Sequence, residues 1–262
     1  MIRALYTAAS GMNAQQQNLD TVANNLANSA TAGFRKRRME FQDMIYQNLV
    51  TPGAASSTST ASAGLQIGLG TRTAASEVIQ TQGSLTQTDN TLDVAIQGAG
   101  FFQVTMPDGT TAYTRAGSFH LNNQGTIVTA DGNPVTPSIT VPSNATSVSI
   151  SQYGMVSAVL PGQTSSTQLG QITLATFTNS GGLSALGSNL FQQTSASGNA
   201  ITDVPGGSTG LGTLQQGYLE NSNVDVTEEF VQMIVAQRAY ESNSKVIHVA
   251  DDMYQQINGL VR

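Results

Sequence analysis

Cysteine and tryptophan are absent from the 262 residues, and only 10% of the residues are charged. Without cysteine the chain has neither a disulfide framework nor a thiolate metal site. The same absence suits a chain that is exported unfolded into an oxidising compartment, where a stray thiol could mispair. Because about a quarter of residues are charged in typical soluble domains, this surface must depend on ion pairs less than most.

The few charges are also unevenly distributed. From Gly132 to Thr202 the sequence contains no Asp, Glu, Lys or Arg, and the net charge of the chain is −6. Such a stretch resembles extracellular bacterial polymers and adhesins more than cytoplasmic enzymes. The acidic balance argues against nucleic acid as a partner.

Long apolar runs are missing as well. Nothing approaches the roughly 18 apolar residues that a membrane-spanning helix needs, so we expect no membrane insertion. The first residues, Met1 to Tyr6, have no apolar core and no small-residue cleavage site, so no ordinary signal peptide is expected. We therefore expect export by a route that removes no leader.

Apolar residues do recur every seven positions near both ends of the chain. The first stripe is Leu5, Met12, Leu19 and Leu26, with Ala9, Gln16 and Ala23 four further on and Val22 beside them. The second is Val226, Met233, Tyr240, Ile247, Tyr254 and Val261, with Ala236, Ala250 and Ile257 three further on. Heptad stripes keep one helical face toward a partner helix. We therefore expect paired terminal helices, with the rest of the chain inserted between them.

The two predicted helices differ in strength. The first, from about Arg3 to Asn28, contains Gly11 and several Asn residues, all poor helix formers, so its stability should come from packing against neighbours. Gly33 is suited to the left-handed turn that follows it. The second should begin after Asp225, an N-cap residue with Glu228 three positions later.

Between the helices the pattern is that of short strands separated by turns. Strands are expected at 92–97, 101–105, 112–115, 126–128, 147–151, 155–160 and 171–177, with turns at 107–110, 122–125 and 131–132. Residues 39–49 are a short helix or an extended segment, 52–70 an irregular excursion, and 181–212 resemble a loop.

These elements predict an α+β fold in which paired, coiled-coil-like N- and C-terminal helices flank a mainly antiparallel β domain. The expected parts are a terminal helical domain (1–30 and 225–262), a connector with an extended loop or hairpin excursion (31–72), and a β-rich outer domain (73–224).

Residues able to support catalysis are sparse. The only histidines, His120 and His248, lie in different elements and show no metal-ligand spacing. The acids of the β region are Asp89, Asp93, Asp108 and Asp131, of which the last two already have turn positions. The glycines at 64–70 and 98–100 open no helix within a βαβ unit, so they do not form a nucleotide loop. We expect no catalytic, cofactor-binding or metal-binding residues, no cofactor and no enzyme activity.

A basic cluster follows the first helix, at Arg35, Lys36, Arg37 and Arg38. It could bind phosphate or an acidic membrane surface. We favour an inter-subunit electrostatic patch that meets acidic residues of a neighbouring copy, with Glu228, Glu229, Asp251 and Asp252 as candidates.

Four sequence motifs carry a family resemblance. They are Ala23–Asn28 with Thr31–Lys36, Asp93–Phe102, Tyr113–Phe119 with Gly125 and Asp131–Gly132, and Gly217–Asp225 continuing through Met233–Lys245. They resemble the signatures of the bacterial flagellar rod and hook axial proteins, and they span essentially the whole chain. Within that family, the length and the segments Tyr46–Leu49, Pro52–Ala54 and Gly64–Gly68 are similar to the distal rod branch.

The resemblance implies a structural subunit that polymerises into a rigid hollow tube, in the part of the basal body that crosses the periplasm. It also implies the partners: further copies of the chain, proximal rod proteins, the hook or hook junction, the outer-membrane and peptidoglycan rings, and the flagellar type III export apparatus. The expected assembly residues are Leu5, Met12, Leu19, Val22, Asn24, Asn25, Leu26, Asn28, Met233, Tyr240, Ile247, Tyr254 and Ile257. The alternatives are a proximal rod or hook subunit, an extracellular β-domain adhesin, and a secreted polysaccharide-cleaving enzyme.

Overall fold

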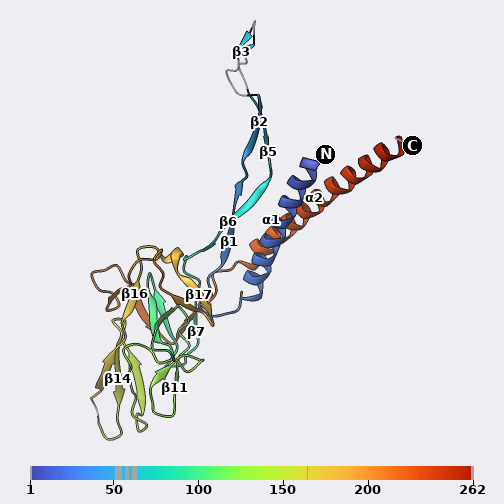
Figure 1. The fold of residues 1–262 in the computed structure, drawn as a ribbon. Helices are drawn as coiled ribbons and strands as arrows, with labels where there is room; N and C mark the ends of the chain where they lie inside the picture. Colours follow the sequence, from blue (N-terminus) through green and yellow to red (C-terminus); the bar gives the residue numbers. More distant parts are fainter. Residues whose placement is uncertain (1, 51–54, 57–58, 61–63, 164, 261–262) are drawn as a thin grey trace. The chain divides into compact units, whose positions relative to one another are not determined.

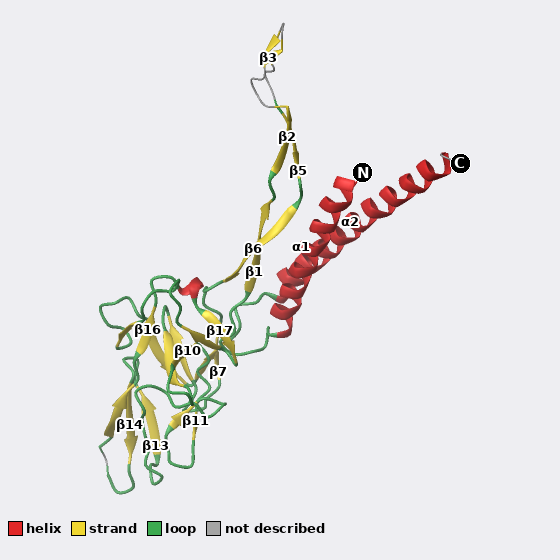
Figure 2. Cartoon of the chain, viewed as in Figure 1, coloured by secondary structure: helices red, strands yellow, loops and turns green. Residues whose placement is uncertain are grey.

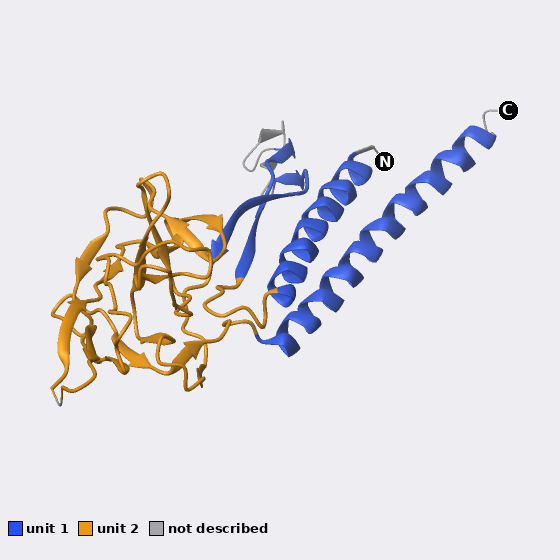
Figure 3. Cartoon of the chain, turned by 90° about the horizontal axis from the view of Figure 1, so that it is seen from below, with its two compact units in different colours: residues 1–27, 37–78, 225–262 blue, residues 28–36, 79–224 orange. Residues whose placement is uncertain are grey.

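The structure is a computed structural model that describes residues 2–50, 55–56, 59–60, 64–163 and 165–260. The chain forms two compact units (Figure 3). Unit 1 combines residues 1–27, 37–78 and 225–262, and unit 2 combines residues 28–36 and 79–224. Both ends of the chain thus belong to one unit, which also contains the segment that follows the first helix.

Unit 1 is built on two long helices, α1 (Ile2–Ala27) and α2 (Val226–Leu260). They lie side by side, with the start of α1 and the end of α2 at the same end of the pair (Figure 1). The predicted helix pairing is therefore present, and it is antiparallel. None of the described helices is long and apolar enough to cross a membrane.

The rest of unit 1 is a two-stranded ribbon (Figure 2). Its strands are β1 (Arg37–Asp43), β2 (Tyr46–Val50), β3 (Ala55–Ser56), β4 (Ser59–Thr60), β5 (Leu65–Gly68) and β6 (Thr71–Val78). β1 pairs with β6, β2 with β5 and β3 with β4, all antiparallel. Of the two possibilities left open for residues 39–49, the extended one is observed. Residues 51–54, 57–58 and 61–63 of the predicted excursion lie outside the described ranges.

The described residues of unit 2 form strands, the turns and loops that join them, and one short 3-10 helix, η1 (Ser180–Gly182). A six-stranded sheet has the order β17-β18-β10-β9-β16-β19, and a three-stranded sheet the order β13-β14-β15. Three further pairs are β11-β12, β20-β8 and β21-β7. The strands are β7 (Leu85–Gln87), β8 (Val94–Gln97), β9 (Phe101–Thr105), β10 (Thr111–Thr114), β11 (His120–Leu121), β12 (Ile127–Val128), β13 (Ser147–Ile150), β14 (Met155–Val159), β15 (Thr167–Gln171), β16 (Leu174–Thr176), β17 (Ser184–Gly187), β18 (Leu190–Gln192), β19 (Ile201–Asp203), β20 (Thr213–Gln216) and β21 (Tyr218–Glu220).

The core of unit 2 lies on both faces of the six-stranded sheet. Successive side chains of a strand point to opposite faces, and in β9 Phe101 and Phe102 accordingly belong to two different apolar clusters. Phe102 packs edge to face on Phe119 with ring centroids 5.0 Å apart. Phe101 packs in the same way on Phe177 and Phe191. The centre of this sheet is therefore buried on both faces.

The turns predicted at 107–110 and 122–125 and the left-handed conformation predicted for Gly33 are confirmed. Gly109 and Gly125 have positive φ angles of 81° and 77° and stand in the turns that join β9 to β10 and β11 to β12. Gly33 also takes a left-handed conformation, with φ of 71°. The fold class is confirmed as α+β, whereas the domain boundaries drawn from the sequence stay a prediction.

One expectation about the secondary structure of unit 2 is wrong. Residues 181–212, which resemble a loop in sequence, contribute β17, β18 and β19. Each of these strands is only three or four residues long, and Gly, Ser and Asn surround them. Too few residues alternate for a strand period to emerge, so the pairing with β10 and β16 decides their conformation.

Candidate functional site

The terminal helices, which pack on each other and on the ribbon, bury few side chains, and most of these are small or polar. The buried side chains of α1 are Ala8, Ala14, Val22 and Asn25, and those of α2 are Glu229, Ala236 and Ala250. Small side chains allow two helix backbones to approach closely, and polar ones can fix their register. The seam between the two helices is therefore narrow, and they bury little apolar area within one chain.

Asn25 holds this seam to the first strand of the ribbon. Its side-chain amide donates to the backbone carbonyl of Arg37 at 2.8 Å and accepts from the backbone N–H of the same residue at 2.9 Å. It also donates to the carboxylate of Glu229 at 3.1 Å. Asn25 and Glu229 are each 1% exposed. One buried amide thus connects α1, α2 and β1.

A second close approach lies further along the pair. A side chain on Gly11 would place its Cβ 2.8 Å from the amide nitrogen of Asn243, so glycine leaves room for that amide. Residue 11 contacts residue 243 and residue 25 contacts residue 229, so the residue number falls on α2 as it rises on α1. This is the pattern of antiparallel packing. The start of α2 is capped by Asp225, whose carboxylate accepts from the backbone N–H of Thr227 at 2.8 Å, as predicted.

The predicted assembly residues fall into three groups by burial. Val22 and Asn25 are buried. Leu5, Met12, Leu19, Leu26, Asn28, Met233, Ile247 and Tyr254 are partly exposed. Asn24, Tyr240 and Ile257 are exposed. Their role in contacts between subunits stays a prediction, because a single chain holds no neighbour.

The secondary stripe on the first helix is placed differently from the expectation. Ala9 and Ala23 are exposed, while Ala8 and Ala14 are buried. The heptad pattern was defined by leucine and methionine residues, which are only partly buried and lie beside the buried alanines. Small residues carry little hydrophobic weight, so a seam made of them gives a weak periodic signal.

Large apolar side chains instead remain exposed along α2 and along the ribbon. On α2 they are Val226, Phe230, Val231, Ile234, Val235, Tyr240, Val246, Val249, Met253 and Ile257. On the ribbon they are Phe41, Met44, Ile45, Tyr46, Leu49, Val50, Leu65, Ile67 and Leu69. Exposed apolar surface of this extent is typical of an interaction site.

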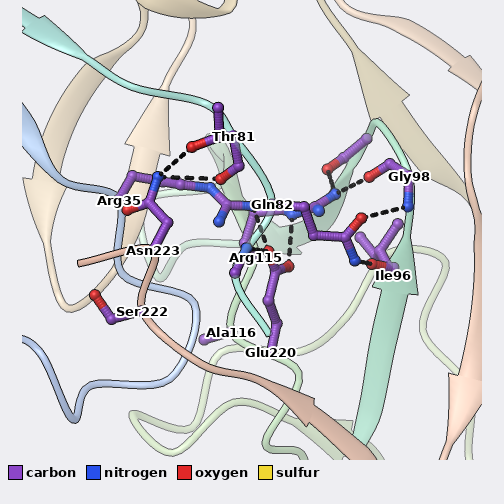
Figure 4. Close-up of polar contacts among 12 residues, drawn as sticks. Arg35, Thr81, Gln82, Ile96, Gly98, Arg115, Ala116, Glu220, Ser222 and Asn223 are labelled. Carbon is purple, nitrogen blue, oxygen red and sulfur yellow. Dashed lines mark hydrogen bonds and ion pairs between the residues drawn. The ribbon is translucent and has the colours of Figure 1, made fainter. Parts of the chain in front are cut away.

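Unit 2 contains a buried ionic cluster that the sequence did not predict (Figure 4). Glu220 accepts from Arg35 Nη2 at 2.7 Å and from Arg115 Nε at 3.0 Å. Arg115 Nη1 also donates to the backbone carbonyls of Gly98 and Gly100, at 2.9 and 2.6 Å. Burial lowers the pKa of Arg115 to about 10, although the nearby Glu220 carboxylate opposes that shift. Arg115 is therefore still charged at neutral pH.

The chain enters and leaves unit 2 beside this cluster. The backbone N–H of Lys36 donates to the side chain of Asn223 at 2.7 Å, and Asn223 in turn donates to the carbonyls of Ile79 and Thr81. The backbone N–H of Gly33 donates to the carbonyl of Glu220 at 2.8 Å. Segments at 33–36, 79–83 and 220–223 are thereby held together within unit 2.

Arg35 accordingly does not belong to the predicted electrostatic patch. Its side chain is 1% exposed and pairs with Glu220 of the same chain. Arg38 does lie on the surface, where it pairs with Glu77 at 2.8 Å in unit 1. The patch remains a prediction for Arg38, Lys36 and Arg37. Within the described ranges, no group of three or more His, Asp or Glu could hold a metal ion.

Asn25→Ala tests the seam. The substitution removes both hydrogen bonds to Arg37 and one to Glu229. It leaves the backbone N–H and carbonyl of Arg37 without these partners, at about 1–3 kcal/mol each. We expect helix content in far-ultraviolet circular dichroism to fall and the minimum concentration for polymerisation to rise. Asn13, which is exposed on the same helix, is the control. Asn13→Ala should leave both readouts unchanged or slightly improved, because alanine is the better helix former. Equal behaviour of the two variants would contradict the role of Asn25.

In unit 1 the two ends of the chain form a helix pair that leaves apolar surface uncovered, and the β unit is inserted between these helices in the sequence. These features define the class of an axial, self-associating subunit. The comparisons agree with this class. Residues 5–35 match the family described as flagella basal body rod protein, residues 95–158 the flagellar hook protein FlgE/F/G D1 domain, and residues 215–260 the flagellar basal body rod FlgEFG protein C-terminal family.

Full-length relatives are more specific. The chain is 49% identical over 261 residues to the flagellar basal-body rod protein FlgG of Buchnera aphidicola subsp. Acyrthosiphon pisum, covering 99% of this chain and 100% of the relative. It is 50% identical over 256 residues to FlgG of Caulobacter vibrioides, covering 97% of each, and 43% identical over 266 residues to FlgG of Bacillus subtilis, covering 100% of each. The chain belongs to the family of flagellar basal-body rod proteins.

Proposed function

We propose that this chain is a structural subunit of the flagellar distal rod, which polymerises into a rigid hollow tube. The tube transmits motor torque to the hook, and exported subunits pass through its channel. The observation that carries the proposal is the large apolar surface of α2 and of the ribbon, which one chain leaves uncovered. The names of its relatives as basal-body rod proteins support the same function.

In this proposal the helices form the inner layer and the β unit the outer layer. The seam of α1 and α2 buries small residues, so most of the apolar area of the pair is left for neighbouring copies. Leu19 of α1 and Ile247 of α2 are partly exposed and belong to this uncovered apolar surface. Lateral packing of many copies would cover it and stabilise α1, whose Gly11 and Asn residues make it weak alone. A weak helix also suits export in an unfolded form.

The proposed neighbours follow from the position in the axis. They are further copies of this chain, proximal rod proteins below, the hook or hook junction above, and the peptidoglycan and outer-membrane rings around the tube. The flagellar type III apparatus would export the chain. A relative in Bacillus subtilis named flagellar hook-basal body complex protein FlhP is only 29% identical. The relatives named basal-body rod protein are 43–50% identical to this chain, which supports a place in the rod.

The ribbon offers the most direct test of rigidity. Ile45 is 82% exposed, so replacing it changes little within one chain. Ile45→Asp should leave the unfolding of the monomer unchanged but make polymers more flexible, because a charge would lie in the contact between copies. The measurement is the persistence length of polymers in electron micrographs. Glu40→Gln, also exposed on the ribbon, is the control. Polymers of Ile45→Asp as stiff as the wild type would exclude a stiffening role for this residue.

A further inference from the structure

The ionic cluster of unit 2 has an unequal number of charges. Two arginines, Arg35 and Arg115, face one carboxylate, Glu220. Their side chains are 1% and 4% exposed, and that of Glu220 is 0% exposed. Among the residues that the structure describes, one positive charge is thus left without a carboxylate partner in a site nearly closed to water. A buried charge is costly unless it is paired.

Hydrogen bonds are missing in the same place. Arg35 donates only through Nη2, and its Nε and Nη1 are buried with no hydrogen-bond partner among the described residues. Arg115 donates through Nε and Nη1. Unsatisfied buried donors are rare in folded proteins, and an ion that completes the site is one physical explanation.

A cavity of about 220 Å³ adjoins the two arginines. Its lining includes Arg35, Arg115, the backbone at 98–100, Gln80 and Ser180, and it contains no acidic residue. Gln80 Nε2 donates to the carbonyl of Ser180 at 3.4 Å, a long and weak contact. The rest of the lining is Phe101, Thr176 and Phe177, so the donors share the wall with two aromatic rings. The small volume suits a compact anion and not a nucleotide.

We propose that this cavity binds a small oxyanion, a carboxylate or an inorganic phosphate, through Arg35 and Arg115. Guanidinium groups match the paired oxygens of such anions geometrically. The oxyanion would neutralise the excess positive charge of the two buried arginines. Its source is either free anion in solution or a carboxylate of another copy of the chain.

The test is an NMR titration of the full chain, kept below its polymerisation concentration, with sodium phosphate and, separately, sodium acetate. Sodium chloride holds the ionic strength constant. We expect saturable shifts of the Gly98, Ala99 and Gly100 backbone amides. No saturable shift with either anion would overturn the proposal.

Ser180→Glu provides the matched perturbation, since it places a carboxylate at the cavity and leaves both arginines intact. We expect it to weaken phosphate binding at least about ten-fold by repulsion and competition. Thr178→Glu adds the same charge at an exposed position outside the lining and should leave binding within about two-fold of the wild type. Should Ser180→Glu fail to fold, Ala99→Phe can fill the cavity instead. Equal binding by the cavity variant and Thr178→Glu would refute the site.

Polymerisation then separates the two sources. If a carboxylate of another copy occupies the cavity, phosphate must compete with it and raise the minimum polymerisation concentration at constant ionic strength. If the anion is taken from solution, phosphate should leave that concentration unchanged or lower it. Both results support an oxyanion site and differ only in the origin of the oxyanion.

Discussion

Leu19→Glu is expected to abolish polymerisation while unit 2 stays folded. Leu19 is partly exposed on α1, in the stripe that neighbouring copies should cover. Covering a carboxylate there without a partner removes it from water, which is strongly unfavourable. We expect the minimum polymerisation concentration to rise at least about 100-fold, which corresponds to roughly 2.7 kcal/mol. Sedimentation and electron microscopy measure this concentration, and NMR of the unit 2 amides reports folding.

The control for this variant is Asn13→Glu, which adds the same charge at an exposed position of α1 outside the stripe. It should polymerise close to the wild-type concentration. Ile247→Glu on α2 should repeat the loss seen for Leu19→Glu, because both residues belong to the predicted assembly surface. Normal polymers from Leu19→Glu would show that the stripe does not form contacts between copies.

Glu220→Ala should have the largest effect on the stability of unit 2. The substitution leaves Arg35 and Arg115 buried together without a carboxylate. Breaking a buried ion pair on one side typically costs about 3–5 kcal/mol. It also removes the acceptor of the Gly83 backbone N–H, which donates to Glu220 Oε1 at 3.0 Å. Urea unfolding followed by circular dichroism measures the loss.

Glu77→Ala is the matched comparison, since Glu77 also pairs with an arginine. In that pair Arg38 and Glu77 have side chains that are 64% and 45% exposed. Exposed pairs contribute about 0–1 kcal/mol, so this variant should unfold almost as the wild type does. A loss of less than about 1 kcal/mol for Glu220→Ala would mean that the cluster does not stabilise unit 2.

The sequence predicts the parts of this fold whose pattern is local. The terminal helices follow from the heptads, and the turns at Gly109 and Gly125 follow from residues that tolerate positive φ angles. The cap at Asp225 is local as well. Each of these features needs only a few neighbouring residues to specify it.

The ionic cluster escapes such analysis because its members are far apart in the chain. Arg35 lies in a run of four basic residues, which indicates a surface patch, and nothing local shows that it pairs with Glu220. A usable signal did exist. Arg35, Arg115 and Glu220 each lie in one of the motifs that carry the family resemblance, and a fourth motif supplies Gly98 and Gly100. In this fold, residues of four motifs that are far apart in the sequence contact one another in one cluster.

The seam was only partly predictable for a related reason. Ala8 and Ala14 are small, and Glu229 is charged, so none of them adds to an apolar stripe. Their burial depends on how closely two backbones approach, which is a property of the pair. Asn25 was predicted as an assembly residue, and the structure also gives it a role within one chain, in the bond to Arg37.

The central claim is that this chain is a subunit of the distal rod. The most direct measurement is quantitative mass spectrometry of flagellar basal bodies purified from the source bacterium, before and after the hook is sheared off. We predict that the chain is present in a fixed ratio to the ring subunits and is retained after shearing. Loss together with the hook would make it a hook subunit, and absence from the particle would contradict the axial function altogether.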